Sequence, residues 1–254
     1  MANVRVLLAG ESWVSAGIHV KGFDRFAAAE YQIGIATLRD ALAGGDVTLT
    51  HLAGHLVPTE FPSDRRTLDA YDVVVLSDIG SNSLLLHPDT FVRGQRTANR
   101  LSLIAEWVEA GGGFMMIGGY LSFQGIDGTA RYHRTPIERI LPVEMLPYDD
   151  RAEVPEGFTP QPGAAAGHPV LAGIEGDWPY LLGYNETKAK AGAEVLLRTG
   201  PGPDAPPLLT AGRYGRGRTM AWTSDIGPHW LPAAFSEWSG YARLWKQAFA
   251  WLAG

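Results

Sequence analysis

Short, fully apolar segments that alternate with helix-like segments are the feature of this sequence that most constrains its fold. Residues 4–10 (VRVLLAG), 73–79 (VVVLSDI) and 113–119 (GFMMIGG) carry hydrophobic side chains at consecutive positions rather than at every second one. A strand has this pattern when both of its faces are buried, as in a parallel sheet covered by helices. The pattern therefore predicts an α/β fold with a mostly parallel central sheet.

Two helices and a further strand are predicted between these segments. Asp24 is a suitable N-cap for a helix that runs to about Ala43, where two glycines end it. Residues 47–52 (VTLTHL) follow as a strand. From about residue 97 a second helix, with apolar residues spaced three or four apart, runs to the glycines at 111–113.

The second half of the chain is expected to extend the same domain, so that residues 1–254 form one unit. Residues 125–190 are rich in proline and glycine and predict an elaborated loop region. Residues 208–214 and 218–224 flank a Gly-Arg-Gly turn and predict a late β-hairpin. Residues 236–252 predict a closing C-terminal helix.

An aromatic face runs along this closing helix, where Trp238, Tyr241, Trp245 and Phe249 are spaced three or four residues apart. Packing of this face against the sheet is the favoured interpretation. The alternatives are an aromatic stripe that binds a ligand and an interface in a homo-oligomer.

The complete absence of cysteine and the net charge of −6 exclude several kinds of site. Without a thiol the chain has no disulfide, no thiolate-bound metal and no cysteine nucleophile. The acidic balance argues against a nucleic-acid partner. No apolar run approaches the ~18 residues of a membrane span, and residues 1–11 do not resemble a signal peptide. We therefore expect a cytoplasmic protein without a membrane partner.

Polar side chains gather where the predicted parallel strands end, which is where open parallel sheets bind ligands. The candidates are Glu11, Ser12, Trp13, Asp78, Gly119, Tyr120, Ser122, Gln124, Asp225, His229 and Trp230. We expect them to surround one site for a small-molecule ligand. The alternative is ordinary loop structure, because Ser, Asp and Gly also serve turns; for Asp225 and His229 the alternative is ordinary loop hydrogen bonding.

The strand at 113–119 and the turn after it resemble the nucleophile elbow of class I glutamine amidotransferase-like proteins. The elbow of that family is Gly-x-Cys-x-Gly, often with a glutamine two residues further on. Gly118 and Gln124 match this pattern, whereas Tyr120 stands at the cysteine position and Ser122 at the second glycine. The resemblance therefore covers the elbow without its nucleophile.

The late strand also resembles the family and also departs from it. Residues 218–225 (RTMAWTSD) are similar to the segment that ends in the family's His-x-Glu pair, which puts Thr223 at the histidine and Asp225 at the glutamate. The Cys-His-Glu triad is thus altered at all three positions. A phenol with a pKa near 10 is a poor nucleophile, and Ser122 lacks a Gly-x-Ser-x-Gly setting. We expect no glutaminase activity, with Tyr120 available as a general acid or an oxyanion donor.

Longer segments are similar to a branch of this superfamily described as cytoplasmic glutamine amidotransferase-like proteins, related to trehalose-utilization-type domains. They comprise residues 132–151, 168–170, 182–189 and 214–230 and the tryptophan-rich C-terminal helix. The resemblance implies a flavodoxin-like three-layer sandwich, and it implies no settled reaction.

A charged cluster at Asp149, Asp150 and Arg151 has two interpretations of equal weight. The carboxylates are suited to a hard cation or to sugar hydroxyls, and the guanidinium to an anionic group. In the alternative the cluster is a turn in which Arg151 pairs with its own neighbours. Asn185 is a further candidate for hydrogen bonding to a polar ligand.

Two classes of function remain open at this point. The leading hypothesis is binding of a sugar derivative or a carboxylate, with acid–base chemistry of the hydrolase or isomerase type by Tyr120, Asp225, His229 and Glu11. A runner-up enzyme hypothesis is hydrolysis assisted by a cation on Asp149 and Asp150. The competing class is a non-catalytic binding or scaffold module that forms a homo-oligomer. We expect no cofactor and no structural metal; His51 and His55 have zincin-like spacing but lack the glutamate base.

Overall fold

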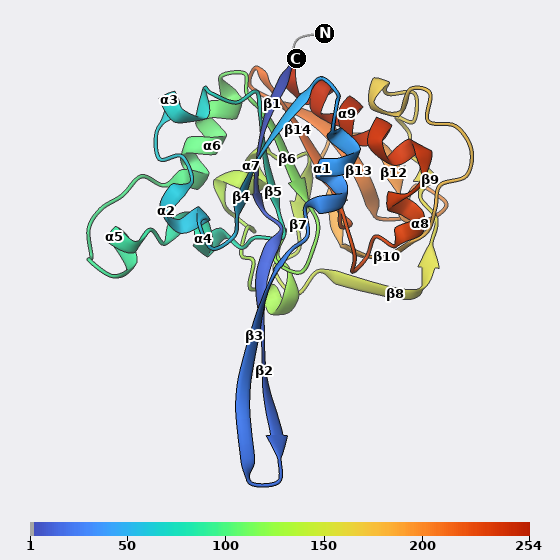
Figure 1. Ribbon diagram of the computed structural model, residues 1–254. Helices are drawn as coiled ribbons and strands as arrows, with labels where there is room; N and C mark the ends of the chain where they lie inside the picture. The colour runs from blue at the N-terminus through green and yellow to red at the C-terminus, as the bar shows by residue number, and fades with distance from the viewer. Residues whose placement is uncertain (1–2) are drawn as a thin grey trace.

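The computed structural model describes residues 3–254 and is built around an eight-stranded sheet (Figure 1). In spatial order its strands are β4 (Val47–Ala53), β1 (Val4–Gly10), β5 (Val73–Ser77), β6 (Gly113–Ile117), β14 (Gly217–Trp222), β13 (Pro207–Tyr214), β12 (Glu194–Arg198) and β9 (Gln161–Pro162). The first five are parallel to one another, and the last three continue the sheet in antiparallel pairs. The predicted mostly parallel α/β sheet is confirmed.

Helices cover both faces of this sheet and complete the three-layer sandwich. One layer contains α1 (Ala36–Leu42), α8 (Ala233–Ser236) and α9 (Ser239–Ala253). The other contains α2 (Val57–Glu60), α3 (Arg65–Leu68), α4 (Ser81–Leu85), α6 (Arg100–Glu109) and α7 (Pro136–Ile140). The short α5 (Pro88–Phe91) buries no residue.

Alternate residues of the central strands supply two separate cores, which explains the continuous apolar runs. In β1, Val6 and Leu8 pack with the layer of α1 and α9, whereas Leu7 and Ala9 pack with the layer of α6 and α7. All four side chains are at most 2% exposed. A strand between two helical layers needs apolar residues at every position, as the sequence predicts for β1, β5 and β6.

The order of the parallel strands places a topological switch point between β1 and β5. From β1 the chain forms β4 on one side, then crosses to β5 on the other and continues outward through β6. This is the flavodoxin-like order, in which ligands bind beyond the carboxyl ends of the two strands at the switch. Glu11 directly follows β1 and Asp78 directly follows β5.

The predicted helix from Asp24 to Ala43 is wrong over most of its length. Residues 12–33 instead form a β-hairpin of β2 (Ser12–Lys21) and β3 (Asp24–Ile33), here called the arm, and α1 begins only at Ala36. Gly22 has a φ of +64° in the two-residue loop, where positive φ is needed. The alanine-rich stretch in β3 suggested a helix, but cross-strand pairing to β2 overrides this preference. Figure 1 shows the arm extending away from the body, at the end opposite both termini.

The other predicted elements agree with the structure within a few residues. The late hairpin is β13 and β14, and the closing helix is α9. The aromatic face of α9 lies in the core: Tyr241 and Trp245 are each 1% exposed and Phe249 is fully buried. This burial favours the core interpretation over a ligand stripe or an interface.

The proline-rich region contains small elements rather than a further layer. Two two-stranded antiparallel sheets pair β7 (Val143–Met145) with β11 (Thr187–Ala189) and β8 (Arg151–Phe158) with β10 (Leu181–Asn185). The same region holds two 3-10 turns, Ile126–Gly128 and Pro169–Leu171, and also α7 and the edge strand β9. Among residues 3–254, no helix is both long enough and apolar enough to cross a membrane.

Candidate functional site

The two residues at the switch point have unusual backbone conformations. Glu11 has a φ of +49° and Asp78 a φ of +43°, although neither is glycine. Such residues cost roughly 1–3 kcal/mol each and cluster at functional sites. The close approach of the strand ends requires Gly10, because a Cβ there would lie 1.8 Å from the carbonyl oxygen of Ser77. The strained backbone at Glu11 and Asp78 thus holds their two carboxyl groups at the edge of the sheet.

Glu11 is a buried acid, only 3% exposed. The hydroxyl of Ser77 donates a hydrogen bond to its Oε1. Burial raises the pKa of Glu11 well above its usual range, and the nearby charges of Asp225 and Asp78 raise it further. Its environment therefore favours the protonated form of Glu11.

The carboxylate of Asp78 accepts the hydrogen bond of a backbone amide in the elbow. Its Oδ1 accepts a hydrogen bond of 2.7 Å from the amide of Leu121, the residue after Tyr120, and its own amide donates to the hydroxyl of Ser122 at 3.0 Å. In nucleophile elbows the amide after the nucleophile stabilises the oxyanion. Here a carboxylate of the protein already uses that amide. Burial raises the pKa of Asp78 to about 6, despite the hydrogen bond from Leu121.

Asp225 and His229 form a pair at the same edge. Nδ1 of His229 lies 3.8 Å from Oδ2 of Asp225, and the amide of Ile226 donates to Oδ1 of Asp225 at 2.8 Å. Burial raises the pKa of Asp225, and this carboxyl group in turn raises the pKa of His229. The Asp225 side chain is 7% exposed and that of His229 is 52% exposed, so only the imidazole is presented to a ligand.

Aromatic rings surround the imidazole. The ring of Tyr120 stacks on that of His229 at 5.3 Å and 9°, and Trp13 lies 6.1 Å from His229. Trp230 packs against Tyr120 at 5.6 Å, and the guanidinium of Arg151 lies 5.1 Å from the centre of the Tyr120 ring. Burial raises the pKa of Tyr120, with Glu153 adding to this effect. The structure thus brings nine of the predicted residues together: Glu11, Trp13, Asp78, Tyr120, Ser122, Arg151, Asp225, His229 and Trp230.

Asn185 and Asp150 support the elbow from behind. The amide of Gly119 donates to Oδ1 of Asn185 at 3.0 Å, and Nδ2 of Asn185 donates to Asp150 at 2.8 Å. Asp150 also accepts from the amides of Gln124 and Gly125, at 2.8 and 2.9 Å. Asn185 is fully buried and Asp150 is 2% exposed, so both position the elbow rather than meet a ligand.

Three predicted residues are engaged in local structure. Arg151 forms a two-bond pair with Asp149, at 3.0 and 2.8 Å, which favours the turn interpretation of that cluster. The hydroxyl of Ser12 accepts from the amide of Gly54 at 2.7 Å. The side chain of Gln124 donates to the carbonyl of Gly128. Because Asp149 and Asp150 have separate protein partners, they do not converge on a common cation.

Two residues of the site have no counterpart in the sequence prediction. Ser77, the last residue of β5, donates to Glu11. Glu153 accepts from Nε1 of Trp230 at 3.0 Å. A polar residue inside the apolar run of β5 is a signal that points to Ser77. Glu153 lies on β8, in a segment with no distinguishing pattern.

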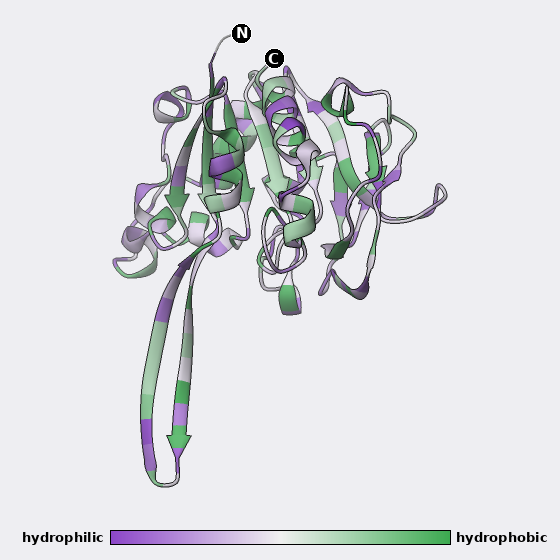
Figure 2. Ribbon diagram, turned by 45° about the vertical axis from the view of Figure 1, so that its right-hand side comes forward, coloured by the Kyte–Doolittle hydropathy of each residue, from purple (hydrophilic) through white to green (hydrophobic). Residues whose placement is uncertain are grey.

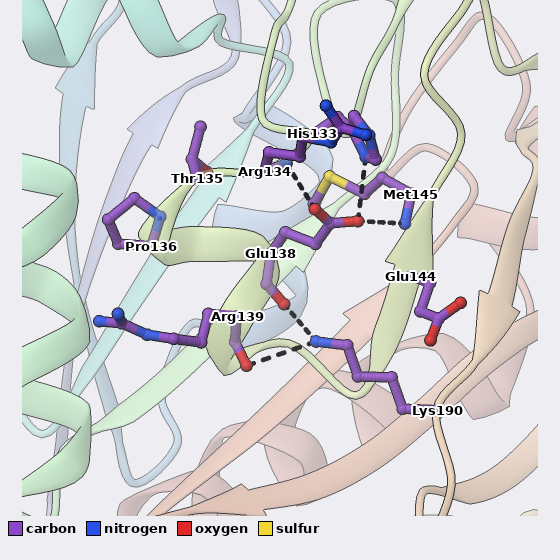
Figure 3. Close-up of a pocket in the computed structure, with 9 residues that line it drawn as sticks. All are labelled: His133, Arg134, Thr135, Pro136, Glu138, Arg139, Glu144, Met145 and Lys190. Carbon is purple, nitrogen blue, oxygen red and sulfur yellow. Dashed lines mark hydrogen bonds and ion pairs between the residues drawn. The ribbon is translucent and has the colours of Figure 1, made fainter.

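A pocket of about 650 Å³ lies apart from these residues and shares none of them. It is lined by parts of α7 and β7 and by Lys190 (Figure 3). There Glu138 accepts from the amide of Met145 at 2.7 Å, and Nζ of Lys190 donates to backbone carbonyls at the end of α7, including that of Leu141 at 2.9 Å. These contacts cap a helix and close a turn, so we do not place the chemistry here.

The predicted histidine pair makes contacts of its own. Nε2 of His51 lies 2.8 Å from the carbonyl oxygen of Gly10, and His55 packs edge-on against Tyr31 at 5.2 Å. Across residues 3–254, no group of three or more histidine and acidic side chains is arranged to hold a metal ion.

The sheet has the flavodoxin-like strand order, and the elbow that follows β6 contains no cysteine. These two features are those of a glutamine amidotransferase-like protein without the catalytic thiol. The chain belongs to the family described as "Putative glutamine amidotransferase", whose model matches residues 5–254. The resemblance found in the sequence is thereby confirmed.

Two solved structures resemble the whole chain. The cytoplasmic protein STM3548 of Salmonella typhimurium is 40% identical, with a TM-score of 0.91 over 97% of this chain and 98% of that one. The cytoplasmic protein STM1381 of Salmonella typhimurium LT2 is 39% identical, with a TM-score of 0.92 over 98% and 99%. A ThuA-like protein of Parabacteroides merdae shares the fold, at 14% identity and a TM-score of 0.58 over 98% and 90%. Comparison with curated proteins gave no match.

Proposed function

We propose that this protein binds a small hydroxylated metabolite, of the sugar-derivative type, at the carboxyl ends of β1 and β5 and acts on it by acid–base chemistry. The observation that carries the proposal is the convergence of Glu11, Asp78 and the Asp225–His229 pair at the topological switch point. Perturbed acids gathered at such a point are typical of catalytic sites.

The chemistry of these groups favours hydroxyl groups over a free carboxylate as the ligand. Asp78 and Asp225 repel an anion, whereas carboxylates accept hydrogen bonds from hydroxyls. The rings of Trp13 and Tyr120 offer apolar faces beside them. The proposal includes sugars that carry a carboxylate, provided that this carboxylate forms an ion pair with the protonated imidazole of His229.

Each group has a distinct role in this proposal. Asp78, with a pKa of about 6, takes a proton from the ligand near neutral pH. His229, held by Asp225, returns a proton. The hydroxyl of Tyr120 donates a hydrogen bond that orients the ligand, and the buried Glu11, bonded to Ser77, supports the site from below. Hydrolase or isomerase chemistry is compatible with this set, and transfer of ammonia from glutamine is not, because no thiol is present.

A thermal-shift screen tests the proposal. Sugars, sugar acids and divalent cations are added to the wild type, to Asp225→Asn and to His229→Ala. Asp89→Asn is the matched control, because Asp89 also lies close to a histidine, His87, at 3.5 Å but away from the site. Ligand at about 100 times its Kd contributes about 2.7 kcal/mol, which for a chain of this size raises Tm by about 5–10 °C.

We expect a sugar-type ligand to raise the Tm of the wild type and of Asp89→Asn, and not that of the two site variants. A shift of equal size in all four proteins refutes the site. Glutamine hydrolysis by the pure protein, above the buffer rate, refutes the exclusion of glutaminase activity.

A non-catalytic binding module is the second candidate, and one observation favours it. Asp78 already occupies the amide of Leu121, so the elbow has no free donor at this position for a developing oxyanion. Ligand binding without turnover of any bound compound distinguishes this candidate. In either case we place the protein in the cytoplasm, as both Salmonella relatives are described.

A further inference from the structure

The arm has one apolar face and one mixed face, because its two strands pair in register. Opposed residues point to the same side, so Val14 lies beside Tyr31, Ala16 beside Ala29 and Ile18 beside Ala27, and the face ends toward the tip at Val20 beside Arg25. The other side carries polar pairs such as Ser15 with Glu30. Alternation of this kind is the pattern of a strand pair with one buried face. Figure 2 shows that the arm projects alone from the body, with apolar residues along its length.

Apart from His55, which packs on Tyr31 at the base, most of this apolar face is exposed. The exposed fractions are 60% for Val14, 71% for Ile18 and 68% for Val20. At the tip, Phe23 is fully exposed. An isolated two-stranded hairpin is at best marginally stable in water, and contiguous exposed apolar side chains mark interaction surfaces.

We propose that the apolar face of the arm stacks on the same face of a second copy of this chain, with the two arms pointing in opposite directions. Opposite directions follow from the shape of the molecule. Stacked faces lie ~10 Å apart, and arms pointing the same way would bring the two much wider bodies into collision. In the proposed arrangement a two-fold axis crosses the arms near Ala16 and Ala29.

The residues along the face complement themselves in this register. Ala16 lies over its own copy, Ile18 over Val14, and Tyr31 over Ala27, so that a large side chain meets a small or medium one. A two-fold interface needs such self-complementarity. The same register carries the tip of each arm to the base of the other.

Charge at the two ends of the arm agrees with this register. The tip carries Lys21 and Arg25 with one acid, Asp24. The base joins the sheet at Glu11, next to the carboxyl groups of Asp78 and Asp225. In this register each cationic tip reaches the acidic site of the other copy. A second copy of this chain therefore complements the charge at both ends of the arm, which an unrelated partner would do only by coincidence.

The area is consistent with a stable dimer only if the tips also make contact. A ten-residue, two-stranded face measures about 33 by 10 Å, so stacking two of them buries on the order of 700 Å². Stable interfaces bury about 1,200 Å² or more. The tips, with Phe23 at their ends, supply the remainder against the opposite body, and they place residues of the second copy beside the proposed ligand site.

Sedimentation velocity of the full chain tests the dimer across a range of protein concentrations. We expect a dimer for the wild type and for Ser15→Glu, which adds a charge to the mixed face of the same strand. Ile18→Glu adds the same charge to the apolar face and should raise the dissociation constant by at least about tenfold. Since the arm contacts no core, circular dichroism should show both variants folded.

The absence of native cysteine allows a second test that is independent of affinity. Ala16→Cys should cross-link between copies with a short bis-maleimide, and Ser15→Cys should not. A monomeric wild type at all concentrations overturns the proposal, as does a dimer that Ile18→Glu leaves intact or equal cross-linking at both positions. If the wild type is a dimer but no sugar-type ligand raises its Tm in the thermal-shift screen, only the proposed function is contradicted.

Discussion

The substitution Asp78→Asn should stabilise the protein above pH 6 while it disables the site. Folding raises the pKa of Asp78 from 3.8 to about 6, mainly because burial penalises the charged carboxylate. The folded state thus binds this proton more tightly than the unfolded chain. Stability is lost as the pH rises from about 4 to about 6, and the ionised carboxylate is a net cost above that range.

The magnitude follows from the same pKa change. A change from 3.8 to about 6 corresponds to about 3 kcal/mol, and partial exposure of the side chain lowers the expected gain to about 1–3 kcal/mol. At about 2–4 °C per kcal/mol for a chain of this size, Tm should rise by roughly 2–10 °C. Asparagine suits the position because its Oδ1 still accepts from the amide of Leu121 and because it tolerates positive φ.

The assay is thermal unfolding of the wild type and Asp78→Asn at pH 4.0 and pH 7.5. We expect the variant to have the higher Tm at pH 7.5 and the difference to shrink at pH 4.0. Asp72→Asn is the control of opposite sign, since its hydrogen bonds with Arg5 lower the pKa of Asp72 and its charge is favourable. An Asp78→Asn variant that is less stable than the wild type at pH 7.5 refutes the reasoning.

Three further predictions concern the core and the support of the elbow. Trp245→Ala removes a ring that is 1% exposed and packs against Trp222 and Tyr241, and should lower the free energy of unfolding in urea by about 3–5 kcal/mol. The control Trp251→Ala, at a partly exposed position, should lower it much less. Asp150→Asn replaces an acceptor of three N–H groups and should cost about 2–4 kcal/mol, whereas Asp204→Asn at an exposed site should change unfolding little. Gly119→Ala should lower Tm, because φ is +137° and the new Cβ lies 2.9 Å from Asp78 Oδ1; Gly17→Ala, with open space around it, should leave Tm unchanged.

The central sheet was predictable from sequence because burial on both faces leaves an unambiguous signal. Every residue of β5 and β6 is buried, so the apolar runs there mark the strands directly. The arm was not predictable by the same means. Residues 27–30 (AAAE) favour a helix locally, and only the register with β2 turns them into a strand. Because the arm does not pack against the core, its sequence carries no burial pattern that would mark it as a pair of strands.

For the candidate site, the sequence could predict where its residues lie and only partly how their side chains are arranged. The strand-end rule places Glu11 and Asp78 at the sheet edge, because both follow parallel strands directly, and the spatial order of the strands then puts both at the switch point. The direction of each side chain depends on contacts between distant segments. Asp150 turns away from Asp149 toward the 124–125 amides, and Asp78 turns toward Leu121. No local pattern in the sequence encodes either choice.

The tyrosine at position 120 and the position of Asp78 both weigh against glutaminase chemistry at the elbow. A thiolate at position 120 would lie next to Asp78, which accepts from the adjacent amide, and near the buried Asp225. Negative charge at this distance raises the pKa of a thiol and lowers its reactivity. Tyr120→Cys alone therefore cannot restore a glutaminase, because the amide remains occupied and Thr223 stands where the resembled family has its histidine. In the proposed function the same carboxylate, with a pKa of about 6, is the proton acceptor, so the proposed reacting group lies at the strand ends of β1 and β5 rather than at residue 120.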